Sequence, residues 1–266
     1  MDFAIIGGDK RQLYLRTLLE EDGHHVTLHQ GSLRKTLANH QHLICGVPFA
    51  KEGHLFTTYG EKIPVDHFLA MLTPEHVLIG GNLQNIPHPH KIDLLTHEPF
   101  VQYNAIPTAE GVLQIAMEET DATLNGAQVM VIGFGRIGAL CAKLFTSMGA
   151  VVTVVTRSAT SRSQSISYGL HTVPYTQMCT HLPLMDLIIN TPPGEIVTAK
   201  HILYIKETAL VIDISSPPFG VSKETEKYGI KTIWARALPG IVAPYSGAVY
   251  MKQAIYELLS IESGGA

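Results

Sequence analysis

Three glycines near the middle of the chain have a spacing that suits phosphate binding. Gly133, Gly135 and Gly138 form the pattern G-x-G-x-x-G, which follows the apolar run Val129–Ile132 and precedes a helical pattern over 136–148. In such a strand–turn–helix unit the first glycine allows a tight turn, the second admits a pyrophosphate and the third lets helix and strand pack closely. We therefore predict a dinucleotide-binding turn, and the alternative is a domain of the same shape that binds nothing. The predicted contacts within this turn are Gly133, Phe134, Gly135, Arg136, Ile137 and Gly138.

The residues after the next strand, 150–156, indicate which dinucleotide is bound. An NAD-binding domain usually carries Asp or Glu there, but no acidic residue occurs between Asp121 and Asp186. Arg157 could instead pair with a 2′-phosphate, so the pattern favours NADP over NAD. The alternative is that Arg157 is an ordinary surface residue. The predicted 2′-phosphate contacts are Thr156, Arg157, Ser158 and Arg162.

Three further loops follow predicted strands of the same domain, where open α/β sheets bind ligands. They begin at Asn190, Asp213 and Ala237, and each is rich in Pro, Gly or small hydroxylic residues. Plain turn chemistry is the alternative for each loop. We assign to the cofactor the residues Asn190, Thr191, Pro192 and Asp213.

The elements that must position these residues form two βα series joined by a long helix. The first series begins with strand 2–6, helix 10–21 and strand 26–29, and the second begins after the turn at Asn125 and Gly126. We expect an α/β fold with two Rossmann-like, doubly wound parallel-sheet domains and a cleft between them. The predicted domains are 1–105 with a returning C-terminal helix 245–266, and 106–244 with the linking helix and the NADP site. Other predicted elements are strands 42–46, 76–80, 100–104, 170–174, 186–190, 208–214 and 231–234, and helices 65–72 and 107–119.

Composition and patterning exclude several classes of protein. The formal net charge of -4 lacks the basic excess of a nucleic-acid-binding protein. The three cysteines form no CxxC pair, and the 14 histidines show no helical ligand spacing, so we expect no metal site and a reducing compartment. No apolar run is long enough to span a bilayer, and we expect no signal peptide.

Several segments resemble the family of dipicolinate synthase A subunits. They are Ile5–Gln12, Tyr103–Gly111, Gly133–Gly138 and Leu238–Pro244, which span nearly the whole chain in the expected order. The fold is also similar to that of D-2-hydroxyacid dehydrogenases, but the His/Glu/Arg catalytic set of those enzymes is not recognisable here.

The resemblance implies NADP-dependent oxidation of a dihydro- or hydroxytetrahydrodipicolinate precursor from the lysine pathway. It implies that the partner is the flavoprotein-like B subunit of dipicolinate synthase and that the compartment is the mother-cell cytoplasm of a sporulating bacterium. We also expect a homo-oligomer. The small dicarboxylate substrate needs donors for its carboxylates, while the proton acceptor stays unknown, with Glu110 a weak candidate. For Asp9, a role as helix N-cap is the alternative. The predicted substrate-binding residues are Gly7, Gly8, Asp9, Arg11, Asn104, Thr108, Ser215, Ser216, Arg236, Pro239 and Gly240.

Two other functions stay open on the sequence. One is a different NADP-dependent dehydrogenase, of the 2-hydroxyacid type, on the same architecture. The other is a non-catalytic NADP-binding subunit, since no convincing acid–base pair is present.

Overall fold

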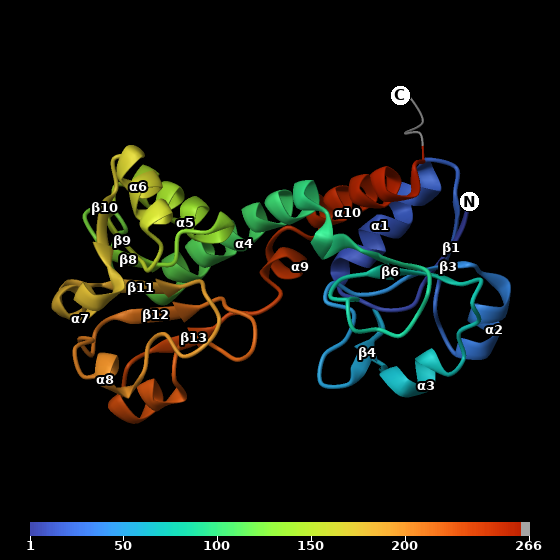
Figure 1. Cartoon of the computed structure of the whole chain (residues 1–266), viewed down its shortest axis with the longest axis horizontal. Coiled ribbons are helices and arrows are strands. Elements are labelled where there is room, and N and C mark those ends of the chain that lie inside the picture. Colours follow the sequence, from blue (N-terminus) through green and yellow to red (C-terminus); the bar gives the residue numbers. More distant parts are fainter. Residues whose placement is uncertain (262–266) are drawn as a thin grey trace. The chain divides into compact units, whose positions relative to one another are not determined.

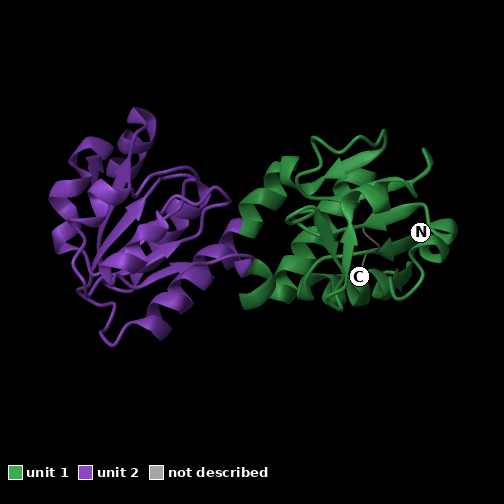
Figure 2. Ribbon diagram, turned by 90° about the horizontal axis from the view of Figure 1, so that it is seen from below, with its two compact units in different colours: residues 1–104, 239–266 green, residues 105–238 purple. Residues whose placement is uncertain are grey.

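The computed structural model describes residues 1–261, and the chain divides into two compact units (Figure 2). Unit 1 contains Met1–Asn104 and the segment from Pro239 onward, and unit 2 is Ala105–Leu238. We expected the second boundary after residue 244, but the chain already returns to unit 1 at Pro239. The last part of the predicted final helix, 262–266, lies outside the described residues.

Unit 1 is built on a five-stranded, fully parallel sheet in the order β2-β1-β3-β6-β7. Figure 1 labels β1, β3 and β6 of this sheet. This is one of the two common orders of doubly wound sheets, with its switch point between the first and third strands. A short antiparallel pair, β4 and β5, follows β3 in the chain. The strands are β1 (Asp2–Ile5), β2 (His25–Leu28), β3 (His42–Ile44), β4 (His54–Phe56), β5 (Lys62–Pro64), β6 (Val77–Gly80) and β7 (Lys91–Asp93).

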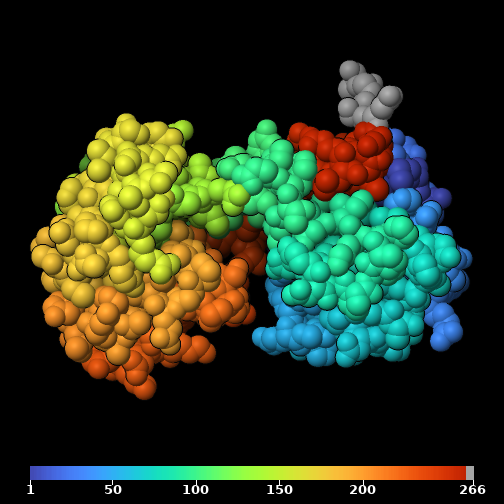
Figure 3. All heavy atoms as spheres, viewed as in Figure 1, coloured from blue at the N-terminus to red at the C-terminus, as the bar shows by residue number. Residues whose placement is uncertain are grey.

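Helices of unit 1 pack in two apolar clusters, because each strand of the buried sheet directs apolar side chains to both faces. One cluster joins the sheet to α1 and α10, and the other joins it to α2 and α3. Asp9 caps α1 in a reciprocal capping box with Gln12. Figure 3 shows α10, in red, on the surface of unit 1 beside the blue N-terminal segment that contains α1. The helices are α1 (Lys10–Glu21), α2 (Leu33–Asn39), α3 (Val65–Leu69), α9 (Leu238–Val242) and α10 (Pro244–Leu259).

Unit 2 is built on a six-stranded parallel sheet in the order β10-β9-β8-β11-β12-β13. In sequence order this is 3-2-1-4-5-6, the arrangement of dinucleotide-binding domains. Its strands are β8 (Gln128–Ile132), β9 (Val151–Thr156), β10 (His171–Pro174), β11 (Leu187–Asn190), β12 (Leu210–Asp213) and β13 (Thr232–Trp234). Its helices are α5 (Arg136–Ser147), α6 (Ala159–Ser167), α7 (Met178–His181) and α8 (Ala199–Ile202).

The helix α4 (Glu98–Glu119) runs from unit 1 into unit 2 and corrects one prediction. We expected a strand at 100–104 and a helix that starts at Pro107, but one helix covers both segments and contains Pro107 in its interior. Phe100 is buried in the core of unit 1, and Tyr103 stacks on Tyr250 of α10 with ring centroids 5.0 Å apart. These tertiary contacts override the strand propensity of the aromatic residues and the helix-breaking tendency of Pro107.

No helix within residues 1–261 is long and apolar enough to cross a membrane. In the same range, no three His, Cys, Asp or Glu side chains are grouped as metal ligands.

Buried and half-buried histidines should make the stability of the fold depend on pH. Burial lowers the pKa of His24, His29, His42 and His201 below the ordinary value of 6.5. Just below pH 6.5 the unfolded chain therefore binds more protons than the folded chain. The contribution of these histidines to the free energy of unfolding is fully present above pH 6.5, and it is lost as the pH falls towards the lowered pKa values. We expect the midpoint temperature of thermal unfolding, measured by calorimetry, to decrease when the pH is lowered from about 7.5 to about 5.5.

The variant His29→Gln isolates one of these groups. His29 is 3% exposed and its Nδ1 lies 2.9 Å from Thr36 Oγ1, whereas His67 is exposed. His29→Gln should flatten the pH dependence, and His67→Gln should leave it unchanged. An equal pH dependence in wild type and His29→Gln would contradict the assignment to His29.

Candidate functional site

The glycine turn of unit 2 has the geometry that phosphate binding requires. Gly133 adopts a φ of 89°, which is accessible to glycine at no steric cost. A Cβ atom on Gly133 would lie 2.4 Å from Thr191 Oγ1, and one on Gly138 would lie 2.3 Å from the Gly133 carbonyl oxygen. A Cβ on Gly135 would meet nothing within 4 Å, so the backbone there is open to an approaching group. The three positions therefore fit a pyrophosphate at the N-terminus of α5.

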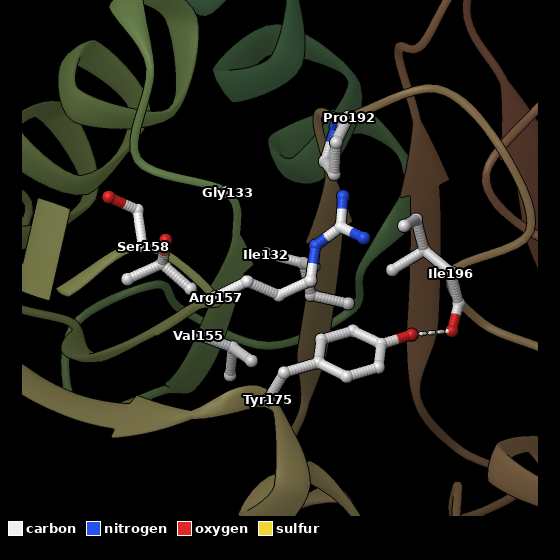
Figure 4. Close-up of a pocket in the computed structure, with 9 residues that line it drawn as sticks. Ile132, Gly133, Val155, Arg157, Ser158, Tyr175, Pro192 and Ile196 are labelled. Atoms are coloured by element: carbon white, nitrogen blue, oxygen red, sulfur yellow. Dashed lines mark hydrogen bonds between the residues drawn. The ribbon is translucent and has the colours of Figure 1, made fainter.

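A hollow of about 200 Å³ lies beside this turn, at the carboxyl ends of β8, β9, β10 and β11. Figure 4 shows the Arg157 side chain extended across it, with the guanidinium directed towards Pro192 and Ile196. The Tyr175 hydroxyl donates a hydrogen bond to the Ile196 carbonyl oxygen, which holds the ring at one wall. Burial raises the pKa of Tyr175, against the smaller effect of the Arg157 charge, so the hydroxyl keeps its proton. The hollow is lined by Ile132, Gly133, Val155, Thr156, Arg157, Ser158, Tyr175, Pro192 and Ile196, none of which is acidic.

The predicted 2′-phosphate residues have different places in this hollow. Thr156, Arg157 and Ser158 line it, and Arg157 and Ser158 are exposed. The Ser158 hydroxyl also accepts the Ser161 N–H and so caps α6. Arg162 does not line the hollow, because its Nη1 donates to the Arg157 carbonyl oxygen at 2.9 Å. Arg162 therefore braces the loop that carries Arg157.

Most polar residues of the loops after β11 and β12 form hydrogen bonds within the unit. Asp213 is fully buried and accepts from Asn190 Nδ2, Ser215 N–H and Val221 N–H at 2.8–3.0 Å. The Thr191 hydroxyl donates to the Ile132 carbonyl oxygen, which ties the β11 loop to the glycine turn. These bonds shape the edge of the site, and of this group only Pro192 lines the hollow.

The remaining residues of the glycine turn and of the predicted substrate set in unit 2 differ in exposure. The Phe134 side chain is buried, whereas Arg136 is exposed and Ile137 is half-buried. The Ser215 hydroxyl accepts the Gly220 N–H, while Ser216 and Arg236 are exposed, with Arg236 4.5 Å from the Phe219 ring centroid. On α4, Thr108 is buried and Glu110 is exposed.

In unit 1 the predicted substrate residues surround an ion pair between the buried Arg11 and the half-buried Asp9. Arg11 is 2% exposed, and its Nε and Nη2 donate to the two Asp9 carboxylate oxygens at 2.9 and 2.8 Å. Arg11 also donates to the Val47 carbonyl oxygen at 2.7 Å and to Asn104 Oδ1 at 3.4 Å. Burial pushes the pKa of Asp9 upward, but the bonds and charge of Arg11 outweigh it and leave the pKa below its ordinary value. Asp9 also has the N-cap role that we weighed for it.

The glycines around this ion pair are close-packed. A Cβ on Gly240 would lie 2.6 Å from the Asp9 carboxylate, so Gly240 packs directly against the ion pair, and its neighbour Pro239 is also buried. A Cβ on Gly7 would lie 2.6 Å from the Phe56 carbonyl oxygen, which accepts the Gly8 N–H at 2.7 Å. The Gly8 N–H is therefore already satisfied within the unit.

Sequence reasoning missed two residues that line hollows at strand ends. Tyr175 follows β10 in unit 2, and Lys51 follows β3 in unit 1, where it lines a smaller hollow with Gly8 and Asp9. Both follow strands that the sequence predicts, so the rule that ligands bind at carboxyl strand ends would have found them.

Comparisons with known proteins agree with this architecture. The family described as the N-terminal domain of the dipicolinate synthase A subunit matches residues 2–86, and the family "Shikimate / quinate 5-dehydrogenase" matches residues 114–230. Among solved structures, the dipicolinate synthase A subunit from Bacillus halodurans is 27% identical with a TM-score of 0.84, covering 98% of both chains. A transhydrogenase from Sinorhizobium meliloti, 13% identical with a TM-score of 0.70 over 97% of this chain and 93% of its own, shares the fold.

The likeness to one curated relative extends over the whole chain. The dipicolinate synthase A subunit from Bacillus subtilis (strain 168) is 30% identical, over 98% of this chain and 96% of the relative. The solved structure of the same enzyme's A chain from Bacillus subtilis has a TM-score of 0.82, with 29% identity over 98% of this chain and 96% of that chain. From this whole-length likeness, and from the two parallel-sheet units that carry it, the chain belongs to the family of dipicolinate synthase A subunits.

Proposed function

We propose that this chain is the dehydrogenase subunit of a dipicolinate synthase, which oxidises a dihydro- or hydroxytetrahydrodipicolinate precursor with NADP. The observation that carries this proposal is the hollow beside the glycine turn of unit 2, which Arg157 enters and no carboxylate lines. Membership of the family and the strand order of unit 2 support a nicotinamide dinucleotide at this place.

Arg157 is the residue that selects NADP in this proposal. Its guanidinium is rigid and always charged, and it can form two parallel hydrogen bonds to a phosphate. Thr156 and Ser158 line the same hollow, and Arg162 donates a hydrogen bond to the Arg157 carbonyl oxygen. An NAD-binding site usually has an acidic group here, and the lining has none.

The chemistry requires little acid–base machinery from the protein. Loss of hydride from a dihydropyridine dicarboxylate gives an aromatic ring, and a bound NADP⁺ supplies the hydride acceptor. The protein must position the ring, hold its carboxylates and accept a proton. Ser216 and Arg236 are exposed donors for this purpose, whereas Arg11 and Ser215 are already bonded within the fold. The proton acceptor is unknown, and Glu110, an exposed residue of α4, is the weak candidate for it.

The biological setting of the proposal follows from membership of the family. An A subunit implies a second kind of polypeptide in the enzyme, which we propose is the flavoprotein-like B subunit. We further propose that the chain forms a homo-oligomer and acts in the mother-cell cytoplasm during sporulation.

Nucleotide binding by wild type and Arg157→Ala tests the cofactor assignment. Wild type should bind NADP⁺ more tightly than NAD⁺ in titration calorimetry. Arg157→Ala should lower the affinity for NADP⁺ by about 10- to 100-fold, because it removes charge-assisted hydrogen bonds to the 2′-phosphate. The affinity for NAD⁺ should stay nearly unchanged. Lys143→Ala, which removes an exposed positive charge from α5 of the same unit, is the matched control and should bind as wild type does.

Three results would count against the proposal. Equal affinity of wild type for both nucleotides, or no effect of Arg157→Ala, contradicts the role of Arg157. Binding without NADP⁺ reduction, with or without the B subunit, favours a non-catalytic role. Turnover of a 2-hydroxyacid instead of the precursor favours the other dehydrogenase class.

A pair of glycine variants separates ligand binding from folding at the turn. Gly135→Ala places its methyl group in open space, so the free energy of unfolding should shift by no more than about 1 kcal/mol while both nucleotides bind more weakly. Gly138→Ala places its methyl group 2.3 Å from the Gly133 oxygen, so it should destabilise unit 2 by about 1–3 kcal/mol. Calorimetric unfolding and nucleotide titration measure the two effects. Full affinity in Gly135→Ala would mean that no pyrophosphate approaches this backbone.

A further inference from the structure

The hollow of unit 1 lies at the switch point of its sheet. Gly8 and Asp9 follow β1, and Gly46 to Lys51 follow β3, so the hollow opens at the carboxyl ends of the two strands where the winding reverses. Open α/β sheets bind ligands at this place. The volume of about 40 Å³ admits a group the size of a few water molecules, such as one carboxylate.

The backbone around the hollow is close-packed. A Cβ on Gly46 would lie 2.7 Å from the Pro48 oxygen and 3.4 Å from Gly8 Cα, so the two strand ends approach each other closely. Lys51 N–H and His54 N–H each bond to the other residue's carbonyl oxygen, at 2.9 and 3.0 Å, across a tight turn with positive φ at Glu52 and Gly53. The backbone that carries Lys51 is thus held at the rim of a preformed hollow.

The charges at this hollow favour an anion. Asp9 lines it, but both Asp9 oxygens are bonded to Arg11, so the two charges offset each other. Lys51 forms no ion pair with any carboxylate of residues 1–261, and its charge contributes to the lowered pKa of Asp9. The remaining charge of Lys51 makes the mouth of the hollow positive.

We propose that this hollow binds one carboxylate of the small dicarboxylate substrate and that Lys51 is its cationic partner. The inference rests on the proposed function for the identity of the ligand. Lys51 donates up to three hydrogen bonds from the rim of the hollow, whereas Arg11 is buried and already bonded to Asp9 and Val47. Lys51 therefore replaces Arg11 as the principal carboxylate ligand of unit 1.

Titration of pyridine-2,6-dicarboxylate, the aromatic product, tests this site directly. Wild type should bind it in calorimetry with or without NADP⁺. Lys51→Gln should weaken binding by at least about tenfold, as expected for a hydrogen bond to a charged group, and Lys51→Arg should restore most of the affinity. Lys35→Gln removes an exposed charge from α2 of the same unit and is the control. Lys62 is unsuitable, because its Nζ lies 5.5 Å from the ring centroid of Phe56, which lines the hollow.

Several outcomes would overturn the inference. They are no binding to wild type in either condition, equal affinity of Lys51→Gln and wild type, and equally tight, Lys51-dependent binding of inorganic phosphate. The test is separable from the cofactor assignment. If NADP⁺ binds but Lys51→Gln has the same dicarboxylate affinity as wild type, this site alone is refuted. If dicarboxylate binding depends on Lys51 but NADP⁺ does not bind, the cofactor assignment alone is refuted.

Discussion

The parallel hydrogen-bonded strands of each unit end at one edge of their sheet, and both candidate sites depend on this constraint. In unit 2 the register of β8, β9 and β11 brings Gly133, Arg157 and Pro192 to one hollow from distant parts of the sequence. In unit 1 the pairing of β1 with β3 does the same for Asp9 and Lys51. The backbone hydrogen bonds set the spacing of these groups, and the loops supply the chemistry.

Buried polar groups at the same edges hold the loops in place. A buried charge is tolerated only when it is paired or hydrogen-bonded, and both Arg11 and Asp213 meet this condition within the fold. The Arg11–Asp9 pair supports the start of α1 and packs beneath Gly240. Asp213 connects the loops after β11 and β12, because its carboxylate accepts hydrogen bonds from the Asn190 side chain and the Val221 N–H. Several polar residues that the sequence singles out therefore hold the fold together, whereas Arg157 and Lys51 line hollows at the strand ends.

The elements that the sequence predicts correctly are those with a strong local pattern. The glycine turn, helix α1 and the apolar strands of both sheets carry their own signals in turn residues, caps and periodicity. Helix α4 is different, because Phe100 and Tyr103 favour a strand and Pro107 favours a helix start. Its continuity follows from packing against α10, which lies far away in the sequence. Likewise, the Ser- and Thr-rich segment after Ser158 forms α6 although its composition carries no helical signal.

By itself, the sequence determined the fold class, the glycine turn and the absence of an acidic residue after β9, because each depends on residues that are neighbours in the chain. Only the tertiary structure decided which polar side chains are free for ligands. Arg11 and Arg157 are equally basic in the sequence, but one is buried against Asp9 and the other extends across a hollow. This difference arises from contacts between distant segments, since burial and hydrogen-bond partners are set by the packing of strands and loops and not by residue type.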